Sequence, residues 1–190
     1  MATAYIMDWP EGSLDQYERV IEKMGLGGRL VDGSVFHAAG EHNGGIRVVD
    51  VWDDEAKFDA FAAEKIGPIT AEEGLGAPSI QAVQVEEVVD ERDGGDGGVQ
   101  ILQVVRMSGM DGDTFQNADN DIRDDGATPD GCMFHVNGPT DDGWIVIDAW
   151  TSKEARDTFL AEKVGPAMQS MGVAPPAIED LSIHNTLTTA

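Results

Sequence analysis

The chain has 190 residues, 41% of them hydrophobic, which is enough to bury the core of one domain or of two small ones. Its 36 acidic and 12 basic residues give a formal net charge of −24, which would repel phosphate backbones and anionic lipid surfaces. We therefore expect neither nucleic acid nor a membrane as a partner. The charge indicates a heavily solvated surface, and adaptation of the protein to high salt is one explanation for such a surface.

The sequence predicts neither a membrane span nor a disulfide. No stretch approaches the roughly 18 to 20 uninterrupted apolar residues of a membrane helix, and the start, MATAYIMDWPEGS, lacks a basic region followed by a long apolar run. Cys132 is the one cysteine, so it cannot form an internal disulfide and is expected simply to pack. A cytoplasmic location is therefore expected.

The first half of the chain begins with a predicted strand and helix. TAYIMDW (residues 3–9) is rich in residues that favour strands, and Ser13 followed by Gln16 is a capping box that opens a helix. A second strand is predicted to run through His37 into the tight loop AGEHNGG. The apolar face of the helix is formed by Leu14, Tyr17, Ile21 and Met24.

The rest of this half completes a β-α-β-β-α-β order. IRVVDVW (residues 46–52) predicts a third strand, after which Asp53 or Asp54 caps a second helix that Gly67-Pro68 is expected to stop. PSIQAVQVEEV (residues 78–88) predicts the fourth strand. This order is that of the split βαβ, or ferredoxin-like, unit.

The same pattern recurs 98 positions further along the chain, which indicates a tandem duplication. We expect a first repeat over residues 1–90, a flexible linker, ERDGGDGG, over 91–98, and a second repeat over 99–190. One unit alone leaves a sheet face bare, and two units can cover each other. The predicted fold is α+β, with two ferredoxin-like βαββαβ repeats packed sheet to sheet. Residues that match at this offset include Asp32 and Asp130, Phe36-His37 and Phe134-His135, Trp52 and Trp150, and Gly67-Pro68 and Gly165-Pro166.

The pattern FHAAG…GIRVVDVWDDEAKFDAFAAEKIGP resembles the dimeric α/β barrel superfamily and, within it, the antibiotic-biosynthesis-monooxygenase-like proteins. The resemblance covers both halves of the chain apart from the linker and the extreme ends. Relatives are usually homodimers of one unit, so the resemblance implies a pseudo-dimeric barrel within one polypeptide. Such a chain is expected to fold as a monomer, although further self-association is possible.

The two central strands of each half predict which side chains share a face. A turn at residues 40–45 would place Ala39 opposite Ile46 and His37 opposite Val48. The other face is wholly apolar, so we expect it to meet the helices and the polar face to point into the barrel between the sheets. The polar face of the first half carries Val35, His37, Ala39, Ile46, Val48, Asp50 and Trp52. That of the second half carries Met133, His135, Asn137, Trp144, Val146, Asp148 and Trp150.

An apolar cavity with a few convergent polar groups is typical of a small-molecule site. In a functional interpretation, His37 and His135 act as general bases or orient a substrate oxygen, Asp50 and Asp148 fix the imidazole tautomer, and the two tryptophans Trp52 and Trp150 form aromatic walls. The alternative is that each His–Asp pair is a buried, mutually satisfied couple that was copied with the rest of the unit. Both interpretations remain open from the sequence.

Two residues break the symmetry between the repeats. Asn137 and Trp144 in the second half correspond to Ala39 and Ile46 in the first. If one cavity has become specialised, we expect it to be the second-half cavity, and we include Asn137 and Trp144 among its ligand-binding residues.

The two remaining histidines are expected to lie outside the site. His42 is in the predicted loop and is expected to be solvated. His184 and Asn185, the counterparts of Glu86 and Glu87, are expected at an exposed strand end.

No motif for a metal, a phosphate or a nucleophilic serine is present, so neither a metal nor a cofactor is expected. The resemblance adds that haem-degrading relatives use a Trp and a His on or after the second helix, where this chain has Phe61 and Phe159 and no histidine. It also implies that oxygenating relatives need no cofactor and act on phenolic polycyclic substrates. Such a substrate could be bound by Tyr5, Trp52, His37 and their partners in the second half.

The function expected from the sequence is the binding of a small, largely apolar and aromatic or polyketide-like molecule, with cofactor-independent oxygenation as the enzymatic form of this hypothesis. The alternative is a non-catalytic barrel that binds a ligand or is retained for stress or salt tolerance. These two classes differ in what the cavity does.

Overall fold

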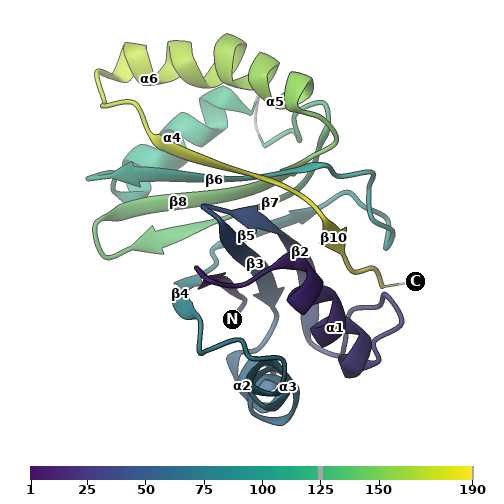
Figure 1. Ribbon diagram of the computed structural model, residues 1–190. Helices are drawn as coiled ribbons and strands as arrows, with labels where there is room; N and C mark the ends of the chain where they lie inside the picture. Colours follow the sequence, from purple (N-terminus) through teal and green to yellow (C-terminus); the bar gives the residue numbers. More distant parts are fainter. Residues whose placement is uncertain (124–125, 190) are drawn as a thin grey trace. The chain divides into compact units, whose positions relative to one another are not determined.

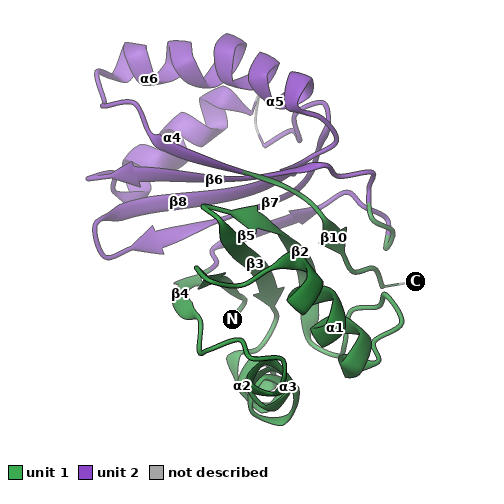
Figure 2. Ribbon diagram, viewed as in Figure 1, with its two compact units in different colours: residues 1–84, 94–96, 181–190 green, residues 85–93, 97–180 purple. Residues whose placement is uncertain are grey.

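The computed structural model describes residues 1–123 and 126–189 (Figure 1). The chain forms two compact units, residues 1–84, 94–96 and 181–190, and residues 85–93 and 97–180 (Figure 2). Residue 190, the predicted end of the second repeat, lies outside the described residues. No helix in the described part of the chain is long and apolar enough to cross a membrane.

Each unit has the predicted order of strands and helices, so the α+β fold with two ferredoxin-like repeats is confirmed. The elements of the first unit are β1 (Thr3–Trp9), α1 (Leu14–Met24), β2 (Ser34–His42), β3 (Gly45–Trp52), α2 (Glu55–Phe61), α3 (Gly67–Glu72), β4 (Ser79–Gln84) and β10 (Asn185–Thr186). Those of the second are β5 (Glu87–Asp90), β6 (Ile101–Ser108), α4 (Gly112–Ile122), β7 (Cys132–Thr140), β8 (Gly143–Trp150), α5 (Lys153–Phe159), α6 (Gly165–Met171) and β9 (Ala177–Ser182).

Each sheet has a fifth strand that comes from outside its own repeat. The sheet orders are β10-β2-β3-β1-β4 and β5-β7-β8-β6-β9. The predicted single strand over 78–88 is therefore wrong, because β4 ends at Gln84 and pairs with β1, whereas β5 begins at Glu87 and pairs with β7. Likewise β10, at the end of the chain, pairs with β2 (Figure 2).

The start of the first helix is as the sequence predicts. The Ser13 hydroxyl accepts a hydrogen bond from the backbone N–H of Gln16, and the Gln16 side chain accepts one from the backbone N–H of Ser13. The second helix, however, does not stop at Gly67-Pro68. A π-helical turn over residues 62–66 connects α2 to α3, and Pro68 lies in the first turn of α3.

The hairpin between β2 and β3 is tighter than predicted. Asn43 and Gly44 form a two-residue turn with φ of 50° and 83°, the left-handed values that such hairpins need. The pairs are therefore Ala39 with Val48 and His37 with Asp50, and the predicted pairing of Ala39 with Ile46 is wrong by two residues. Since a shift of two preserves the side-chain faces, the predicted faces hold except at Val35 and Met133. There a β-bulge places Ser34 and Cys132 opposite Trp52 and Trp150 instead.

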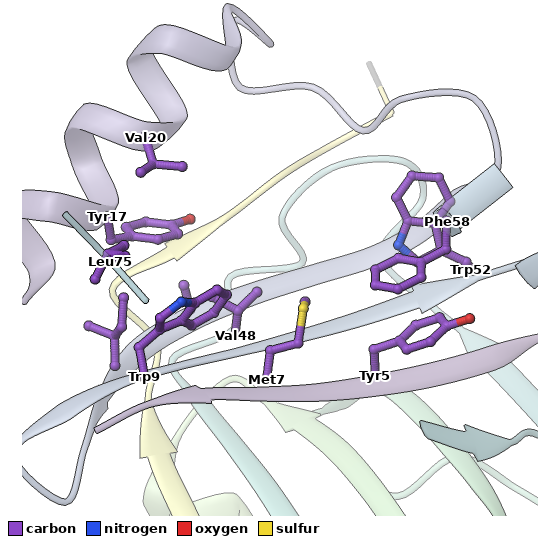
Figure 3. Close-up of a cluster of buried hydrophobic side chains, with 11 residues drawn as sticks. Tyr5, Met7, Trp9, Tyr17, Val20, Val48, Trp52, Phe58 and Leu75 are labelled. Atoms are coloured by element: carbon purple, nitrogen blue, oxygen red, sulfur yellow. The ribbon is translucent and has the colours of Figure 1, made fainter. Parts of the chain in front are cut away.

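The core of the first unit lies between the sheet and its helices. Along β1, Trp9 lies on the side of Tyr17 and Val20 of α1, whereas Tyr5 lies beside Trp52 and Phe58 (Figure 3). The amphipathic face of α1 thus covers the aromatic side of the sheet, which is the packing that the periodicity of Tyr17 and Val20 favours.

We expect Gly45→Ala to lower the free energy of unfolding by about 2 kcal/mol, the scale of overpacking at a closely packed site. A Cβ at this position would overlap the carbonyl oxygen of Trp9 and approach Pro10 Cα to 2.7 Å. Gly76→Ala is the matched control, because its Cβ would meet no atom within 4 Å. Urea unfolding followed by circular dichroism measures both, and equal midpoints for the two variants would contradict this account of the β1–β3 contact.

Candidate ligand-binding site

The His–Asp pair of each unit lies on the face of the sheet that the helices cover. In the first unit the Tyr17 hydroxyl of α1 is 2.7 Å from His37 Nε2. In the second, Trp150 packs on Phe159 of α5, with ring centroids 5.4 Å apart. The expectation that these histidines, aspartates and tryptophans face away from the helices is therefore wrong.

This error has a physical cause. Phe36 and Val49, on the face expected to meet the helices, are fully buried, but so are the residues of the opposite face. A sheet buried on both faces does not reveal its helix side by polarity alone. The large aromatic residues on the same face as His37 indicate the side that the helices cover. Trp9 and Trp52 provide the apolar surface against which the helices pack.

In the first unit three side chains form a continuous hydrogen-bonded chain. His37 Nδ1 lies 2.6 Å from Asp50 Oδ1, and the Tyr17 hydroxyl is at Nε2. Burial raises the pKa of Tyr17 well above its ordinary value, so the phenol keeps its proton. Asn185 donates to the Tyr17 oxygen at 2.7 Å, which leaves the hydroxyl proton for His37 Nε2.

The C-terminal strand holds this chain in place. The Thr186 hydroxyl donates to the carbonyl oxygen of His37 at 2.7 Å, and the backbone N–H of His184 donates to that of Ala39 at 2.8 Å. The His184 ring contacts Glu18 of α1, with Nε2 2.9 Å from Oε1. His184 is exposed at the start of this strand, as expected, but the expectation is wrong for Asn185, which is half-buried and pairs with β2 beside His37.

In the second unit the same pair has different partners. His135 Nδ1 lies 2.7 Å from Asp148 Oδ1, while Nε2 is 3.0 Å from Asn137 Nδ2. The Trp144 indole N–H donates to Asn137 Oδ1 at 3.2 Å. Because an indole can only donate, it fixes the amide so that its NH₂ group faces His135. Asn137 and Trp144, predicted as ligand-binding residues, thus form hydrogen bonds beside His135. A role of theirs in ligand binding stays a prediction.

A carboxylate from β5 also reaches His135. Glu87 Oε2 accepts from Asn137 Nδ2 at 3.0 Å, lies 3.5 Å from His135 Nε2 and accepts from Arg123 at 2.6 Å. Asp119, one turn earlier on α4, accepts from the same guanidinium at 2.6 Å. The buried network around His135 therefore holds three carboxylates and one arginine.

These charges control the protonation of His135. Burial by itself lowers the pKa of His135, but the hydrogen bonds to Asp148 and Glu87 and the charge of Asp148 outweigh it and raise the pKa to about 9. The hydrogen bond to His135 lowers the pKa of Glu87 to about 2, with burial opposing and Arg123 adding to the effect. The hydrogen bond from the Asn137 amide to Nε2, by contrast, requires a neutral His135, because Nε2 accepts a hydrogen bond only when it carries no proton. In the protonated ring Nε2 is a donor, so the contact with the Asn137 NH₂ group is lost and Glu87 Oε2, 3.5 Å away, is the acceptor.

Each pair lies on the wall of a cavity between sheet and helices. Both cavities have a volume of about 60 Å³. The first is lined by Tyr17, His37, Asp50 and Trp52 among mainly apolar side chains. The second is lined by Gln103, Asp119, Arg123, Cys132, His135, Asp148 and Trp150, also among apolar side chains. Burial raises the pKa of Cys132 well above its ordinary value, so its thiol stays protonated and packs.

Three predicted ligand-binding residues, Tyr5, Asn137 and Trp144, are absent from the walls of their cavities. Tyr5 stacks on Phe58 of α2 with ring centroids 3.6 Å apart and is not part of the cavity wall. Burial raises the pKa of Tyr5 to about 12. Its ring therefore serves the packing of α2 on the sheet.

Sequence reasoning misses six residues that complete the two sites: Tyr17, Asn185, Glu87, Gln103, Asp119 and Arg123. Tyr17 was assigned only to the helix core, although its counterpart Phe115 lacks the hydroxyl that reaches His37. The two repeats differ at Tyr17 and Phe115 and again at Ala39 and Asn137, and these differences together indicate that Tyr17 belongs to the site. Within residues 1–123 and 126–189, no three His, Cys, Asp or Glu side chains are grouped so that they could hold a metal ion.

We expect Glu87→Gln to lower the pKa of His135 by about 1 unit or more, because it removes one of the carboxylates at the ring. Since the folded pKa of about 9 lies above the ordinary 6.5, protonation of His135 stabilises the fold fully below pH 6.5, and this contribution is lost as the pH rises through 9. An NMR titration of the imidazole measures the pKa, and Glu86→Gln is the exposed control. A value near 6.5 in both wild type and Glu87→Gln would contradict a charged network.

The chain was also compared with known proteins. No family model and no curated protein sequence matches it. A proposed monooxygenase from Lactobacillus acidophilus matches in structure with a TM-score of 0.70 at 15% identity, covering 100% of this chain and 97% of that one. A proposed monooxygenase from Fusobacterium nucleatum matches with a TM-score of 0.75 at 11% identity, covering 100% and 95%.

A third match is an uncharacterised ferredoxin-fold protein from Listeria monocytogenes that is related to antibiotic biosynthesis monooxygenases, with a TM-score of 0.50 at 8% identity and coverage of 96% and 94%. At such identities the likeness concerns the fold. The resemblance seen in the sequence is thus confirmed at that level: over its whole length the chain has the fold of antibiotic-biosynthesis-monooxygenase-like proteins.

Proposed function

We propose that the protein binds a small, largely apolar molecule in the helix–sheet cavity of its second unit. The observation that carries this proposal is the make-up of the cavity wall, which is apolar except for a compact polar cluster around His135 and Asp148. Concave apolar sites with a few convergent polar groups are the usual form of small-molecule sites.

The second cavity is favoured over the first as the ligand site because it adjoins a hollow at the surface of the protein. A surface hollow of about 310 Å³ shares Ile122, Arg123, Pro129 and Phe159 with the wall of the second cavity. The cavity itself, at about 60 Å³, holds only a few water-sized groups and lies below the range of about 300–1,000 Å³ that is typical of larger ligands. A ligand would place its head in the cavity and its body in the hollow.

A second candidate function is cofactor-independent oxygenation in the first unit, favoured by the Tyr17–His37–Asp50 chain. An imidazole whose Nδ1–H is held by a carboxylate presents Nε2 as a base, and Tyr17 connects that nitrogen to the cavity. A substrate acid in the cavity could lose its proton along this chain and react with oxygen as a carbanion. Two of the structures with this fold are described as proposed monooxygenases, which is support by analogy.

Filling one cavity at a time tests the binding proposal. Val48 and Val146 are equivalent positions on the walls of the first and second cavities. We expect Val146→Phe to weaken the binding of 1-naphthol by more than tenfold, which is about 1.4 kcal/mol, and Val48→Phe to leave it unchanged. Calorimetric titration measures the affinity, with circular dichroism as the check of folding. No binding of 1-naphthol or of a wider aromatic panel to the wild type would refute the proposal.

Oxygen consumption with 1,8-dihydroxyanthrone tests the catalytic candidate. His37→Gln removes the base next to Tyr17, so we expect the rate of uptake to fall by about 100-fold or more, as for the loss of a general base. His135→Gln is the matched control in the second unit and is expected to keep the rate. An uptake equal to the uncatalysed rate in wild type, or a His37→Gln rate equal to wild type, would leave a non-catalytic binding protein.

A further inference from the structure

Two buried N–H donors on the wall of the second cavity lack an acceptor. The side chains of Gln103 and Trp150 are 1% and 0% exposed. Among the described residues, neither Gln103 Nε2 nor Trp150 Nε1 has a hydrogen-bond partner, and both side chains line the cavity. Buried donors are almost always paired in folded proteins, so two unpaired donors at one cavity indicate a place for an acceptor.

The strand register places these donors side by side. Gln103 on β6 lies directly opposite Asp148 on β8, and Trp150 is two residues further along β8 on the same face. Such diagonal neighbours are about 7–8 Å apart at Cα, within reach of long and aromatic side chains. One oxygen atom between them can accept from both.

In the first unit the equivalent groups, the Tyr5 hydroxyl and Trp52 Nε1, also lack a hydrogen-bond partner among the described residues, but only Trp52 lies on the wall of the cavity. Tyr5, the counterpart of Gln103, is covered by Phe58 and is absent from the wall of the first cavity. In the second unit the position of Phe58 is taken by Arg156, whose guanidinium donates to Asp180 at 2.5 Å. Gln103 is therefore left facing the second cavity.

The charges around the donors select the kind of acceptor. Asp148 lies next to Gln103 across the strands, and Asp119 is also on the wall. The cations of the wall, Arg123 and His135, are already paired with carboxylates of the protein. A carboxylate ligand would be brought against these acids in a site of low dielectric, where like charges repel strongly. A neutral carbonyl oxygen has two lone pairs for the two donors and carries no net charge.

We propose that the second cavity binds a neutral carbonyl compound, with the carbonyl oxygen accepting hydrogen bonds from Gln103 Nε2 and Trp150 Nε1. This inference rests on the proposed function, because it names the class of molecule that the cavity takes. The apolar part of the ligand lies against the remaining wall and extends toward the hollow beside Phe159.

The experiment compares two molecules of nearly the same shape, acetophenone and α-methylstyrene, in which a CH₂ group replaces the carbonyl oxygen. We expect wild type to bind acetophenone about tenfold more tightly, because α-methylstyrene leaves both donors unpaired. Gln103→Met, which removes one donor at similar length, is expected to fold and to lose most of this preference. Gln100→Met, on the exposed residue just before β6, is the matched control and is expected to keep it.

Calorimetric titration gives the affinities, and the indole N–H resonance of Trp150 gives a second readout that needs no Gln103 variant. Acetophenone should move that resonance downfield, as expected for a new hydrogen bond, whereas α-methylstyrene should not. Equal affinity of wild type for the two molecules, or tighter binding of benzoate than of acetophenone, would overturn the carbonyl assignment and leave the proposed function intact. No binding of acetophenone, α-methylstyrene or 1-naphthol would remove both.

Discussion

A histidine buried opposite an aspartate across two strands needs a bonding partner at each ring nitrogen, and most differences between the two repeats follow from how they meet this need. The aspartate takes Nδ1 in both units. At Nε2 the first unit uses the Tyr17 hydroxyl, oriented by Asn185. The second has Phe115 in place of that tyrosine, and an asparagine two residues from the histidine occupies Nε2 instead.

These exchanges depend on one another. Asn137 could not replace the tyrosine alone, because its amide must be held in one orientation, and the indole of Trp144 does that. Trp144 in turn stacks on Phe115, with ring centroids 5.0 Å apart, where a tyrosine hydroxyl is no longer required. At the level of packing and hydrogen bonds, four substitutions between the repeats are therefore one change in the way His135 is satisfied.

The exchanged strands connect this local chemistry to the fold. Each His–Asp pair is completed by a residue of the fifth strand, Asn185 of β10 in the first unit and Glu87 of β5 in the second. A neutral amide in one place and a carboxylate in the other give the two imidazoles different electrostatic surroundings. A sequence segment that follows one repeat thus completes the hydrogen bonding around the histidine in the sheet it joins.

The sequence was sufficient for the fold class, for the order of the elements and for the sets of residues that share a sheet face outside the two bulges, because these depend on periodicities that the duplication displays twice. It was insufficient for the side of the sheet that the helices cover, since both faces are buried and polarity no longer separates them. The hairpin register also differed, because Asn43-Gly44 favours a two-residue turn that the longer glycine-rich loop concealed. Nothing in local pattern could show that β5 and β10 leave their own repeats, since strand pairing over such separations is a tertiary property.

The two cavities show how a duplicated unit can divide stability and binding between its copies. In the first, Tyr5 and Phe58 stack and fill the space beside Trp52, which adds packing energy and closes that part of the wall. In the second, the equivalent positions hold Gln103 and Arg156, and both Gln103 Nε2 and Trp150 Nε1 are on the cavity wall without an acceptor among the described residues. The Tyr5 hydroxyl and Trp52 Nε1 of the first unit are unpaired in the described part of the chain too, but Tyr5 is absent from the wall of its cavity. Unpaired buried donors destabilise the empty fold. A ligand that supplies the acceptor removes this cost and stabilises the folded chain by mass action. The unsatisfied donors are therefore best understood as the half of a hydrogen-bonded site that the protein itself provides.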